Sequence, residues 1–309
     1  MLINHPSEDH YLLADLLKVL SPKRVINFQN LPITKIVQHS QKVTNYSLFV
    51  AIPGFSTDGH QYIASAIQQG AAAVIGEKTS PSVKKIPYIQ VANSRSALAK
   101  LAAEFYNHPG DKLKLIGVTG STGKTTTTNM INQLLRQATP NTGLIGSLHT
   151  KIKTNNYPQP QGCTTPQPLE LNKRLSAMEQ AEVKYVSMEV SSHALKLDRV
   201  AELDFDLGIF TNLSPDHLNF HHDLTDYYLS KAQLFTNLEP PAVAILNHDD
   251  SHAHQLTNHL SVPYLTYGLS KNADLSAANL QLTKTGTKFQ AILTNKLESL
   301  NGKQIPPAS

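Results

Sequence analysis

The sequence predicts an α/β protein of two domains, the second of which is a phosphate-loop domain with a mainly parallel sheet. Short apolar strands alternate with amphipathic helices along most of the 309 residues, which is the pattern of a parallel sheet wrapped by helices. A glycine-rich turn, GVTGSTGKTTTT at residues 117–128, lies between one such strand and one such helix. Strand, turn and helix in this order are the context that a phosphate loop requires.

The N-terminal domain is predicted to be α/β and to span residues 1–110. Leucines at helical spacing in HYLLADLLKVL predict a helix, and the segments ITKIV and SLFVAI predict short strands. An amphipathic helix, GHQYIASAIQQG, is closed by Gly70, and the strand AAAVIGE follows. The next helix, NSRSALAKLAAEFYN, is capped by Asn93 or Ser94. The stretch YNHPGDK breaks this helix, and we therefore place the domain boundary near residue 110.

The second domain is predicted to span residues 111–309. The strand LKLIGVT leads into the glycine-rich turn, and a helix runs from Lys124 to about Gln137. Apolar strands recur at KYVSMEV, DLGIFTN and AVAILN, with helical segments between them. The last part differs, because NLQLT, the turn KTGTK and FQAILT predict a β-hairpin.

The composition argues against several partners and kinds of site. The net charge of +4 comes from 27 basic and 23 acidic residues without a Lys/Arg-rich block, which argues against a nucleic-acid partner. The single cysteine, Cys163, excludes an intramolecular disulfide framework and a Cys-only zinc site. No secretory leader and no run of about 18 apolar residues is present, so we expect a cytoplasmic protein without a membrane partner.

The turn has the chemistry of an anion cradle. Gly120 and Gly123 let the backbone N–H groups point inward, and the N-terminus of the following helix adds partial positive charge. Lys124 would then reach the β- and γ-phosphates, and the Thr125 hydroxyl would bind Mg²⁺. Val118 stands where the common motif has glycine. The structural alternative is a tight strand-to-helix turn that contains Gly-Lys-Thr by chance.

Two charged residues elsewhere occupy unusual positions. Glu189 ends an apolar strand, where a carboxylate can hold Mg²⁺ at the ligand-binding edge of the sheet, although a solvated strand end is the alternative. Lys231 falls on the inward face of a helix, and its ammonium would otherwise have to reach water from there. The apolar stripe that defines this face comprises Leu224, Tyr228, Ala232 and Phe235.

Two further patterns are weak. Ser192, His193 and Asp198 invite a hydrolase interpretation, but no Gly-x-Ser-x-Gly elbow surrounds the serine. His217, His221 and His222 have a spacing that suggests zinc, but no glutamate lies between them as in H-E-x-x-H. We therefore expect one of these histidines near Mg²⁺ and the others on the surface.

The loop resembles the T-G-x-x-G-K-T loop of the Mur ligases and folylpolyglutamate synthetases. From about residue 33 to about residue 294, further segments are similar to Mur ligases in matching order, and MEVSSHAL and TNLSPDHL are the most specific of them. The others are DGHQYIASAIQQGAAAVI, CTTP, DRV, YYLSKAQLF and LNHDD.

The resemblance implies an ATP-dependent ligase of peptidoglycan precursor synthesis. The family member with the most similar segments adds diaminopimelate or lysine to UDP-N-acetylmuramoyl-L-alanyl-D-glutamate through an acyl phosphate. A nucleotide- or muramoyl-peptide-binding protein that has lost catalysis remains an alternative. Folylpolyglutamate synthetase is a third, which the first domain and MEVSSHAL disfavour.

The resemblance also implies site residues. ATP would bind to Gly120, Ser121, Thr122, Gly123, Lys124, Thr125 and Thr126, with Asn247 and Asp250 as further nucleotide contacts. The catalytic residues would be Lys124, Glu189, His217 and Lys231. Mg²⁺ would be held by Thr125, Glu189, His217 and Lys231, the last after N6-carboxylation. The muramoyl peptide would contact Ser40, Thr164, Thr165, Ser191 and Arg199.

The sequence departs from the family in three places. His39-Ser40-Gln41 replaces an Asp-Ser-Arg segment, and Asn219 stands where aspartate is usual. The sequence stops at Ser309, whereas the family continues into the rest of the central sheet and a C-terminal domain that binds the incoming amino acid. We therefore expect an incomplete central domain, with the C-terminal domain absent or supplied by a separate chain, and little or no ligase activity from this chain alone.

Overall fold

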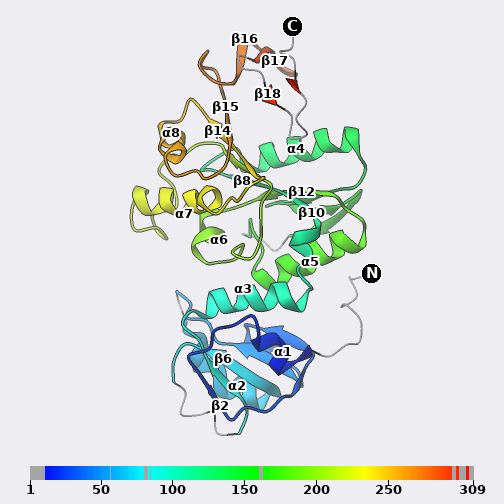
Figure 1. The fold of residues 1–309 in the computed structure, drawn as a ribbon, viewed down its shortest axis with the longest axis vertical. Helices are drawn as coiled ribbons and strands as arrows, with labels where there is room; N and C mark the ends of the chain where they lie inside the picture. Colours follow the sequence, from blue (N-terminus) through cyan, green and yellow to red (C-terminus); the bar gives the residue numbers. More distant parts are fainter. Residues whose placement is uncertain are drawn as a thin grey trace. The chain divides into compact units, whose positions relative to one another are not determined.

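The computed structural model describes residues 11–55, 57–79, 83, 85–159, 163–293, 297–298 and 304–305. It confirms the predicted α/β class (Figure 1). The chain forms two compact units, and each unit is built from three separate stretches of the sequence. Unit 1 comprises residues 1–113, 165–184 and 196–203, and unit 2 comprises residues 114–164, 185–195 and 204–309. The functional division at residue 110 stays a prediction.

Unit 1 contains a five-stranded sheet in the order β2-β7-β6-β5-β4. The parallel strands are β4 (Lys35–Val37), β5 (Ser47–Val50), β6 (Ala71–Gly76) and β7 (Tyr88–Gln90), and β2 (Arg24–Ile26) is antiparallel to β7. A separate antiparallel pair joins β1 (Tyr11–Leu12) to β3 (Pro32–Ile33). The helices are α1 (Leu13–Leu17), α2 (Ile63–Gln68), α3 (Ser94–Phe105) and α5 (Pro168–Gln180), with 3₁₀ turns η1 (Ser40–Lys42), η2 (Gly59–Tyr62) and η3 (Pro109–Lys112).

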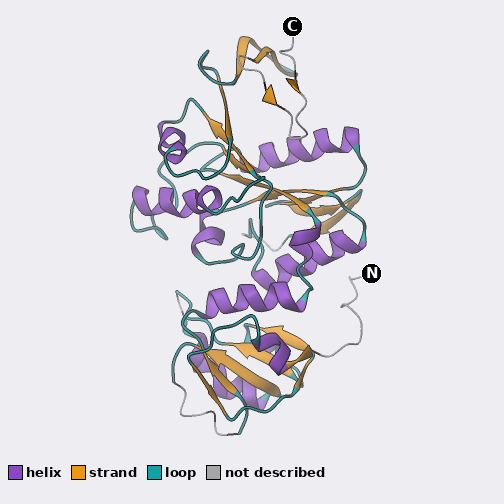
Figure 2. Ribbon diagram, in the orientation of Figure 1, coloured by secondary structure: helices purple, strands orange, loops and turns teal. Residues whose placement is uncertain are grey.

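Both faces of this sheet are covered because side chains alternate along β5. Leu48 packs in one apolar cluster with leucines of α1 and α3, while Phe49 packs in another with Ile63 of α2. Figure 2 shows these helices around the strands of unit 1. Asn93 caps α3 as predicted, since its side chain accepts hydrogen bonds from the backbone N–H groups of Arg95 and Ser96.

The first predicted helix is shorter than its leucine spacing suggests. HYLLADLLKVL predicts a helix over residues 10–20, but α1 spans only Leu13–Leu17. Tyr11 and Leu12 instead pair with Ile33 and Pro32 as a strand. Tertiary pairing of the backbone therefore overrides the local helical pattern at this end.

Unit 2 contains a ten-stranded sheet in the order β11-β10-β9-β12-β8-β13-β14-β15-β16-β17. Seven strands run parallel: β8 (Lys114–Thr119), β9 (Thr142–Ile145), β12 (Tyr185–Glu189), β13 (Leu207–Phe210), β14 (Val243–Asn247), β15 (Tyr264–Gly268) and β16 (Leu275–Thr283). The antiparallel strands are β10 (His149–Ile152) and β11 (Asn155–Pro158) at one edge and β17 (Gly286–Leu293) at the other. The predicted hairpin is thus β16–β17, whereas β10–β11 was not predicted.

The remaining elements of unit 2 are the helices α4 (Lys124–Ala138), α6 (Ser192–Lys196), α7 (Leu224–Thr236) and α8 (Ser251–Thr257), and the short pair β18 (Leu297–Glu298) and β19 (Gln304–Ile305). None of the helices in the described parts of the chain is long and apolar enough to cross a lipid bilayer.

Helices α4 and α7 lie on opposite faces of the sheet in unit 2 (Figure 1). Ile116 and Val118 of β8 pack against Ile131 and Leu135 of α4. The intervening Gly117 faces the other way, where an added Cβ would lie 3.2 Å from Leu234 of α7. The loop after β8 therefore emerges between two helices, at the edge where ligands bind in open parallel sheets.

Candidate active site

The loop that connects β8 to α4 requires its glycines. Gly120 has a φ of 148° and Gly123 a φ of 82°, values that other residues adopt only with strain. A Cβ on Gly120 would also lie 1.9 Å from the Thr211 Oγ1 atom. The predicted curled conformation is confirmed, because only glycine allows the backbone to approach the end of β13 this closely.

The segment after β13 braces the loop. The backbone N–H of Ser121 donates to the Asn212 carbonyl oxygen at 2.9 Å, and that of Thr122 donates to Asn212 Oδ1 at 3.0 Å. Thr211 Oγ1 donates to the Thr122 carbonyl oxygen at 2.7 Å. The backbone N–H of Ser214 donates to Ser121 Oγ at 2.9 Å. Hydrogen bonds to the segment 211–214 thus hold the loop in its curled form.

Lys124 begins α4 and folds back onto the loop. Its Nζ donates to the carbonyl oxygens of Gly120 and Ser121 at 2.8 and 2.9 Å. Burial lowers the pKa of Lys124, although Glu189 and Asp216 oppose this effect. Thr126 lies exposed in the first turn of the same helix. An anion on the loop would give the Lys124 ammonium a stronger partner than the two carbonyl groups.

Glu189 is buried at the end of β12 and contacts the loop helix. Thr125 Oγ1 donates to Glu189 Oε2 at 2.9 Å, and the backbone N–H of Ser147 donates to Oε1 at 2.8 Å. The alternative of a solvated strand end is wrong for this residue. Gly146 permits the contact, because a Cβ there would lie 2.5 Å from Glu189 Oε1.

Ser147 is a residue that sequence reasoning missed. Its Oγ lies 3.0 Å from Glu189 Oε2 and 3.2 Å from Thr164 Oγ1. It therefore connects the buried carboxylate to one of the residues expected to bind the muramoyl peptide. The signal in the sequence was a Gly-Ser pair directly after the apolar strand TGLI, at the carboxyl end where site residues gather.

Lys231 of α7 is buried, as its position on the inward face predicts. Its Nζ donates to the Gly120 carbonyl oxygen at 2.8 Å and lies 4.3 Å from the centre of the Tyr227 ring. The alternative that the ammonium reaches water is wrong, because the residue is only 1% exposed. Burial, together with the nearby Lys124, lowers the pKa of Lys231 to about 6. The amine is therefore mostly neutral near pH 7.

The three histidines behave differently from one another. His217 is half-exposed, has a φ of 54°, and lies 3.5 Å from the Asp216 carboxylate. His222 is on the surface, as expected. His221 was also expected there, but it is buried, because its ring nitrogens contact Ser192 and the Asp226 carboxylate. Among the described residues, no three His, Cys, Asp or Glu side chains form a metal-binding group.

The residues around the loop suit Mg²⁺ better than a transition metal. The Thr125 hydroxyl and the Glu189 carboxylate already touch, and oxygen atoms are the ligands that this small, hard cation prefers. Lys231 offers only a nitrogen in its present form, so it fits the predicted ligand role only as a carbamate. No described hydrogen bond joins His217 to Glu189 or Lys231, so the metal role of His217 stays a prediction.

Asn247 and Asp250 bind the segment after β13 that contacts the phosphate loop. Asn247 Nδ2 donates to the Thr211 carbonyl oxygen at 2.8 Å, and the Leu213 N–H donates to Asp250 Oδ2 at 2.8 Å. Asp250 also caps α8. These contacts give both residues a structural role, and their contact with a nucleotide stays a prediction.

The predicted muramoyl-peptide residues are distributed over both units. In unit 2, Thr164 lies beside Ser147, and Ser191 Oγ accepts from the Ala194 N–H at 3.2 Å. In unit 1, Arg199 Nη1 donates to the carbonyl oxygen of the buried Thr165 at 2.9 Å. Their contacts with substrate stay predictions.

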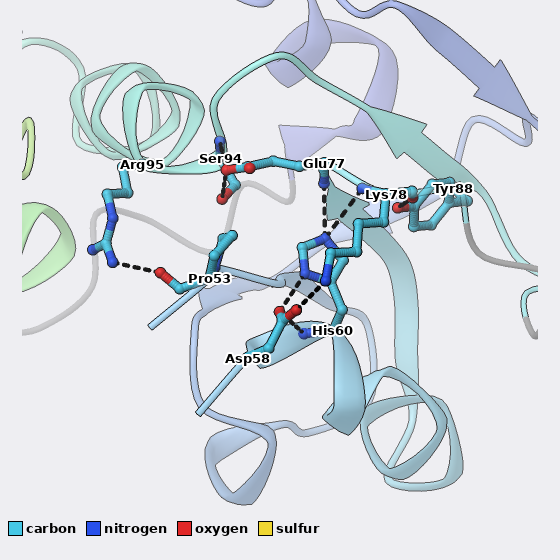
Figure 3. Close-up of polar contacts among 8 residues, drawn as sticks. All are labelled: Pro53, Asp58, His60, Glu77, Lys78, Tyr88, Ser94 and Arg95. Atoms are coloured by element: carbon cyan, nitrogen blue, oxygen red, sulfur yellow. Dashed lines mark hydrogen bonds and ion pairs between the residues drawn. The ribbon is translucent and has the colours of Figure 1, made fainter. Parts of the chain in front are cut away.

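Ser40 lines a cavity of about 390 Å³ in unit 1. His39, Gln41 and Arg95 line the same cavity. Arg95 Nη2 donates to the Pro53 carbonyl oxygen at 2.6 Å (Figure 3). Sequence reasoning did not single out Arg95. Its position in the first turn of a capped helix is the signal that was available, since such a helix fixes the residue rigidly at the cavity.

A polar network supports the part of the cavity near Arg95 (Figure 3). Asp58 Oδ1 lies 2.6 Å from His60 Nδ1, and His60 Nε2 accepts from the Glu77 N–H at 2.8 Å. The Glu77 carboxylate in turn accepts from the backbone N–H and the hydroxyl of Ser94. The network ties η2 and the end of β6 to the first turn of α3, and so fixes the backbone that carries Arg95.

Comparison with known proteins assigns this arrangement to a family. A family model described as the Mur ligase middle domain matches residues 118–305, which is more than half of the chain. The chain belongs to the Mur ligase family. A second Mur ligase model, described as the catalytic domain of the family, matches residues 32–106.

Individual Mur ligases match over most of this chain. The UDP-N-acetylmuramoyl-L-alanyl-D-glutamate–2,6-diaminopimelate ligase of Oceanobacillus iheyensis is 39% identical over 268 residues, which are 85% of this chain and 54% of that protein. The chain thus spans about half the length of the curated relatives it matches. A solved structure of a ligase of the same name superposes with a TM-score of 0.74 at 24% identity, and the match covers 94% of this chain and 58% of the other.

Folylpolyglutamate synthase is a more distant structural neighbour. The Mycobacterium tuberculosis enzyme complexed with ADP and AMPPCP matches with a TM-score of 0.51 at 15% identity over 63% of this chain. This likeness concerns the fold alone. The family match and the 39% identity to a Mur ligase confirm the predicted preference for the Mur ligases over folylpolyglutamate synthetase.

Proposed function

We propose that this chain carries the ATP site and the muramoyl-peptide site of a peptidoglycan-precursor ligase that works in the cytoplasm. The ligase would add diaminopimelate or lysine to UDP-N-acetylmuramoyl-L-alanyl-D-glutamate. The contact of Thr125 with the buried Glu189, beside Lys124 on the phosphate loop, is the observation that carries this proposal. The names of the matched relatives favour diaminopimelate as the added residue.

In the first step the D-glutamyl carboxylate attacks the γ-phosphorus of ATP. An O–P bond forms, the bond between the γ-phosphorus and the β,γ-bridging oxygen breaks, and ADP leaves. Lys124 gives up its hydrogen bonds to the loop carbonyls and neutralises the phosphoryl oxygens. The N–H groups of the loop and of the first turn of α4 orient the phosphates.

In the second step the amine of the incoming amino acid attacks the acyl phosphate. A C–N bond forms, the amine loses a proton, and inorganic phosphate leaves. Mg²⁺, when bound by Thr125 and Glu189, with His217 and a carboxylated Lys231 as further ligands, would offset the charge of the phosphates.

Carboxylation of Lys231 rests on its burial. A neutral amine can add to carbon dioxide, with loss of one proton, to give a carbamate, and the pKa of about 6 leaves Lys231 neutral at neutral pH. Intact-protein mass spectrometry in bicarbonate should show the mass of one added carboxyl group. The Lys231→Met variant should show none.

Unit 1 supplies the proposed site for the UDP moiety. Ser40 and Arg95 line its cavity, and a guanidinium group pairs well with the oxygens of a diphosphate. The partners of the chain are therefore ATP, the UDP-muramoyl dipeptide and an amino acid.

The reaction itself tests the proposal. The chain is incubated with Mg²⁺, ATP and the UDP-muramoyl dipeptide, and ADP is measured with hydroxylamine present to trap an acyl phosphate as a hydroxamate. Dipeptide-dependent formation of both products supports the proposal. Tight binding of both ligands without either product supports the two proposed sites but no reaction by this chain alone, and failure to bind either ligand contradicts both the proposal and the binding-protein alternative. Addition of diaminopimelate or lysine then decides which amine is accepted.

A further inference from the structure

His221 is a buried histidine to which the proposed reaction assigns no role. Its side chain has no exposed surface, and its Nε2 lies 2.9 Å from the Ser192 hydroxyl. Its backbone N–H donates to the His217 carbonyl oxygen at 2.9 Å, which closes a turn in the loop between β13 and α7. The side chain therefore joins the start of α6, which follows β12, to the loop that carries His217.

The other ring nitrogen faces the start of α7. His221 Nδ1 lies 3.4 Å from Asp226 Oδ2 and 3.5 Å from Ser230 Oγ. Ser230 Oγ donates to the Asp226 carbonyl oxygen at 2.7 Å, within the helix. The Tyr227 ring packs against His221 with 4.9 Å between the ring centres. His221 thus joins three segments of unit 2, because its ring contacts Ser192 and the start of α7 and its backbone holds the turn that begins at His217.

Each of these segments carries one of the expected metal ligands. Ser192 lies three residues after Glu189, and the turn closed by His221 begins at His217. Ser230 directly precedes Lys231. A side chain that fixes the three segments to one another also fixes the directions from which the three ligands approach.

Ser192, His221 and Asp226 also resemble the catalytic triad of a serine hydrolase, because the histidine lies between the serine and the aspartate. A nucleophile must be reachable by its substrate, but Ser192 and His221 are each only 1% exposed. The arrangement is therefore better suited to holding segments together than to attacking an ester or amide.

We propose that His221 is a positioning residue of the magnesium site, acting through Ser192 and the start of α7 on Glu189, His217 and Lys231. The inference rests on the proposed function, because it presupposes that these residues hold Mg²⁺. Groups that orient metal ligands from behind influence metal affinity although they do not touch the metal.

The test measures Mg²⁺ and not turnover. A non-hydrolysable ATP analogue is titrated into the protein by calorimetry, first without metal and then at increasing Mg²⁺ concentrations. We expect His221→Ala to weaken the apparent Mg²⁺ affinity by about 10- to 100-fold, as loss of such supporting contacts does. Binding of the analogue without metal should stay close to that of the wild type.

Two variants separate positioning from a loss of folding. In His221→Gln the side-chain amide can still reach the Ser192 hydroxyl, so this variant should recover most of the Mg²⁺ affinity. Ser192→Ala, which removes only that hydroxyl, should show the same selective loss as His221→Ala. The control is His222→Ala, because His222 is the neighbouring histidine and its side chain is 91% exposed. This control should behave as the wild type.

The outcomes are distinct. Unchanged Mg²⁺ affinity in Ser192→Ala and in a folded His221→Ala would overturn the inference, as would equal losses with and without metal. If His221→Ala does not fold, Ser192→Ala and His221→Gln decide by the same criteria. Absence of any Mg²⁺ effect in the wild type would contradict the proposed function itself, and the inference with it.

Discussion

The buried amine of Lys231 donates a hydrogen bond to the carbonyl oxygen of Gly120, 2.8 Å away. This bond joins α7 to the phosphate loop across the end of β8 and places a titratable amine next to the expected nucleotide. Lys124 donates to the same carbonyl oxygen. Burial and the neighbouring Lys124 together lower the pKa of Lys231, so its charged form is disfavoured at this position.

The first prediction concerns pH and stability. Unfolded Lys231 keeps its proton up to about its ordinary pKa of 10.5, but in the folded chain the pKa is about 6. Between these values the unfolded state binds more protons, so Lys231 makes the free energy of unfolding rise with pH. Met has a similar length and does not titrate. The stabilising effect of Lys231→Met should therefore be largest at and below about pH 6 and shrink as the pH rises.

Urea unfolding followed by circular dichroism, in buffer free of carbonate and at several pH values between about 6 and 9, measures this difference. A difference between variant and wild type that stays constant over this range would show that the folded ammonium is not destabilised by burial.

The second prediction concerns Glu189 and Mg²⁺. Glu189→Gln keeps the size of the side chain but removes the charge beside Thr125. Mg²⁺ should then strengthen binding of an ATP analogue about tenfold less than in the wild type, a factor consistent with losing an interaction of roughly 1.5–3 kcal/mol with a charged group. Calorimetry with and without Mg²⁺ measures the effect. The exposed Glu239→Gln serves as the control, and an equal Mg²⁺ effect in both variants would argue against a metal role for Glu189.

The third prediction compares two glycines of similar φ. Gly120→Ala combines a strained φ of 148° with a Cβ that would meet Thr211, and should destabilise unit 2 by about 2–4 kcal/mol. Gly286 has a φ of 155° but nothing within 4 Å of an added Cβ. Gly286→Ala should therefore cost only about 1 kcal/mol. Denaturant unfolding distinguishes them, and equal losses would show that the contact with Thr211 relaxes without cost.

The sequence predicts those site residues that belong to a short motif or to a periodic pattern within one helix. Gly120, Lys124 and Thr125 lie in one short motif, and the inward position of Lys231 follows from helical periodicity. The hydrogen bonds of Ser147 and His221 could not be predicted this way. They join residues 42 and 29 positions away along the chain, and only the parallel strand order brings those segments together.

The fold shows the same limit. The strands β8, β12, β13 and β14 were predictable as apolar runs in an alternating pattern. The hairpin β10–β11 was not, because its residues are mostly polar and pair at an exposed edge of the sheet. The local sequence also does not predict that residues 165–184 belong to unit 1. This grouping depends on the packing of α5 against α3 and η3, which lie far away in the sequence.

The fourth prediction concerns Arg95 and the cavity of unit 1. Arg95→Gln should weaken binding of the UDP-muramoyl dipeptide by about tenfold or more, because a guanidinium group pairs with a diphosphate by charge-assisted hydrogen bonds. Binding of the ATP analogue should not change, since the phosphate loop belongs to unit 2. The control is the exposed Arg24→Gln. Calorimetry with both ligands checks this, and an unchanged dipeptide affinity in Arg95→Gln would exclude the proposed contact.

The most direct test of the account is calorimetric titration of the wild-type chain and of Lys124→Met with a non-hydrolysable ATP analogue and Mg²⁺. Saturable binding at one site is expected for the wild type. The variant lacks the ammonium that lies on the Gly120 and Ser121 carbonyl groups, and its affinity should fall by about tenfold or more. Absence of binding to the wild type, or equal binding to the variant, would contradict the assignment of the loop as an ATP site.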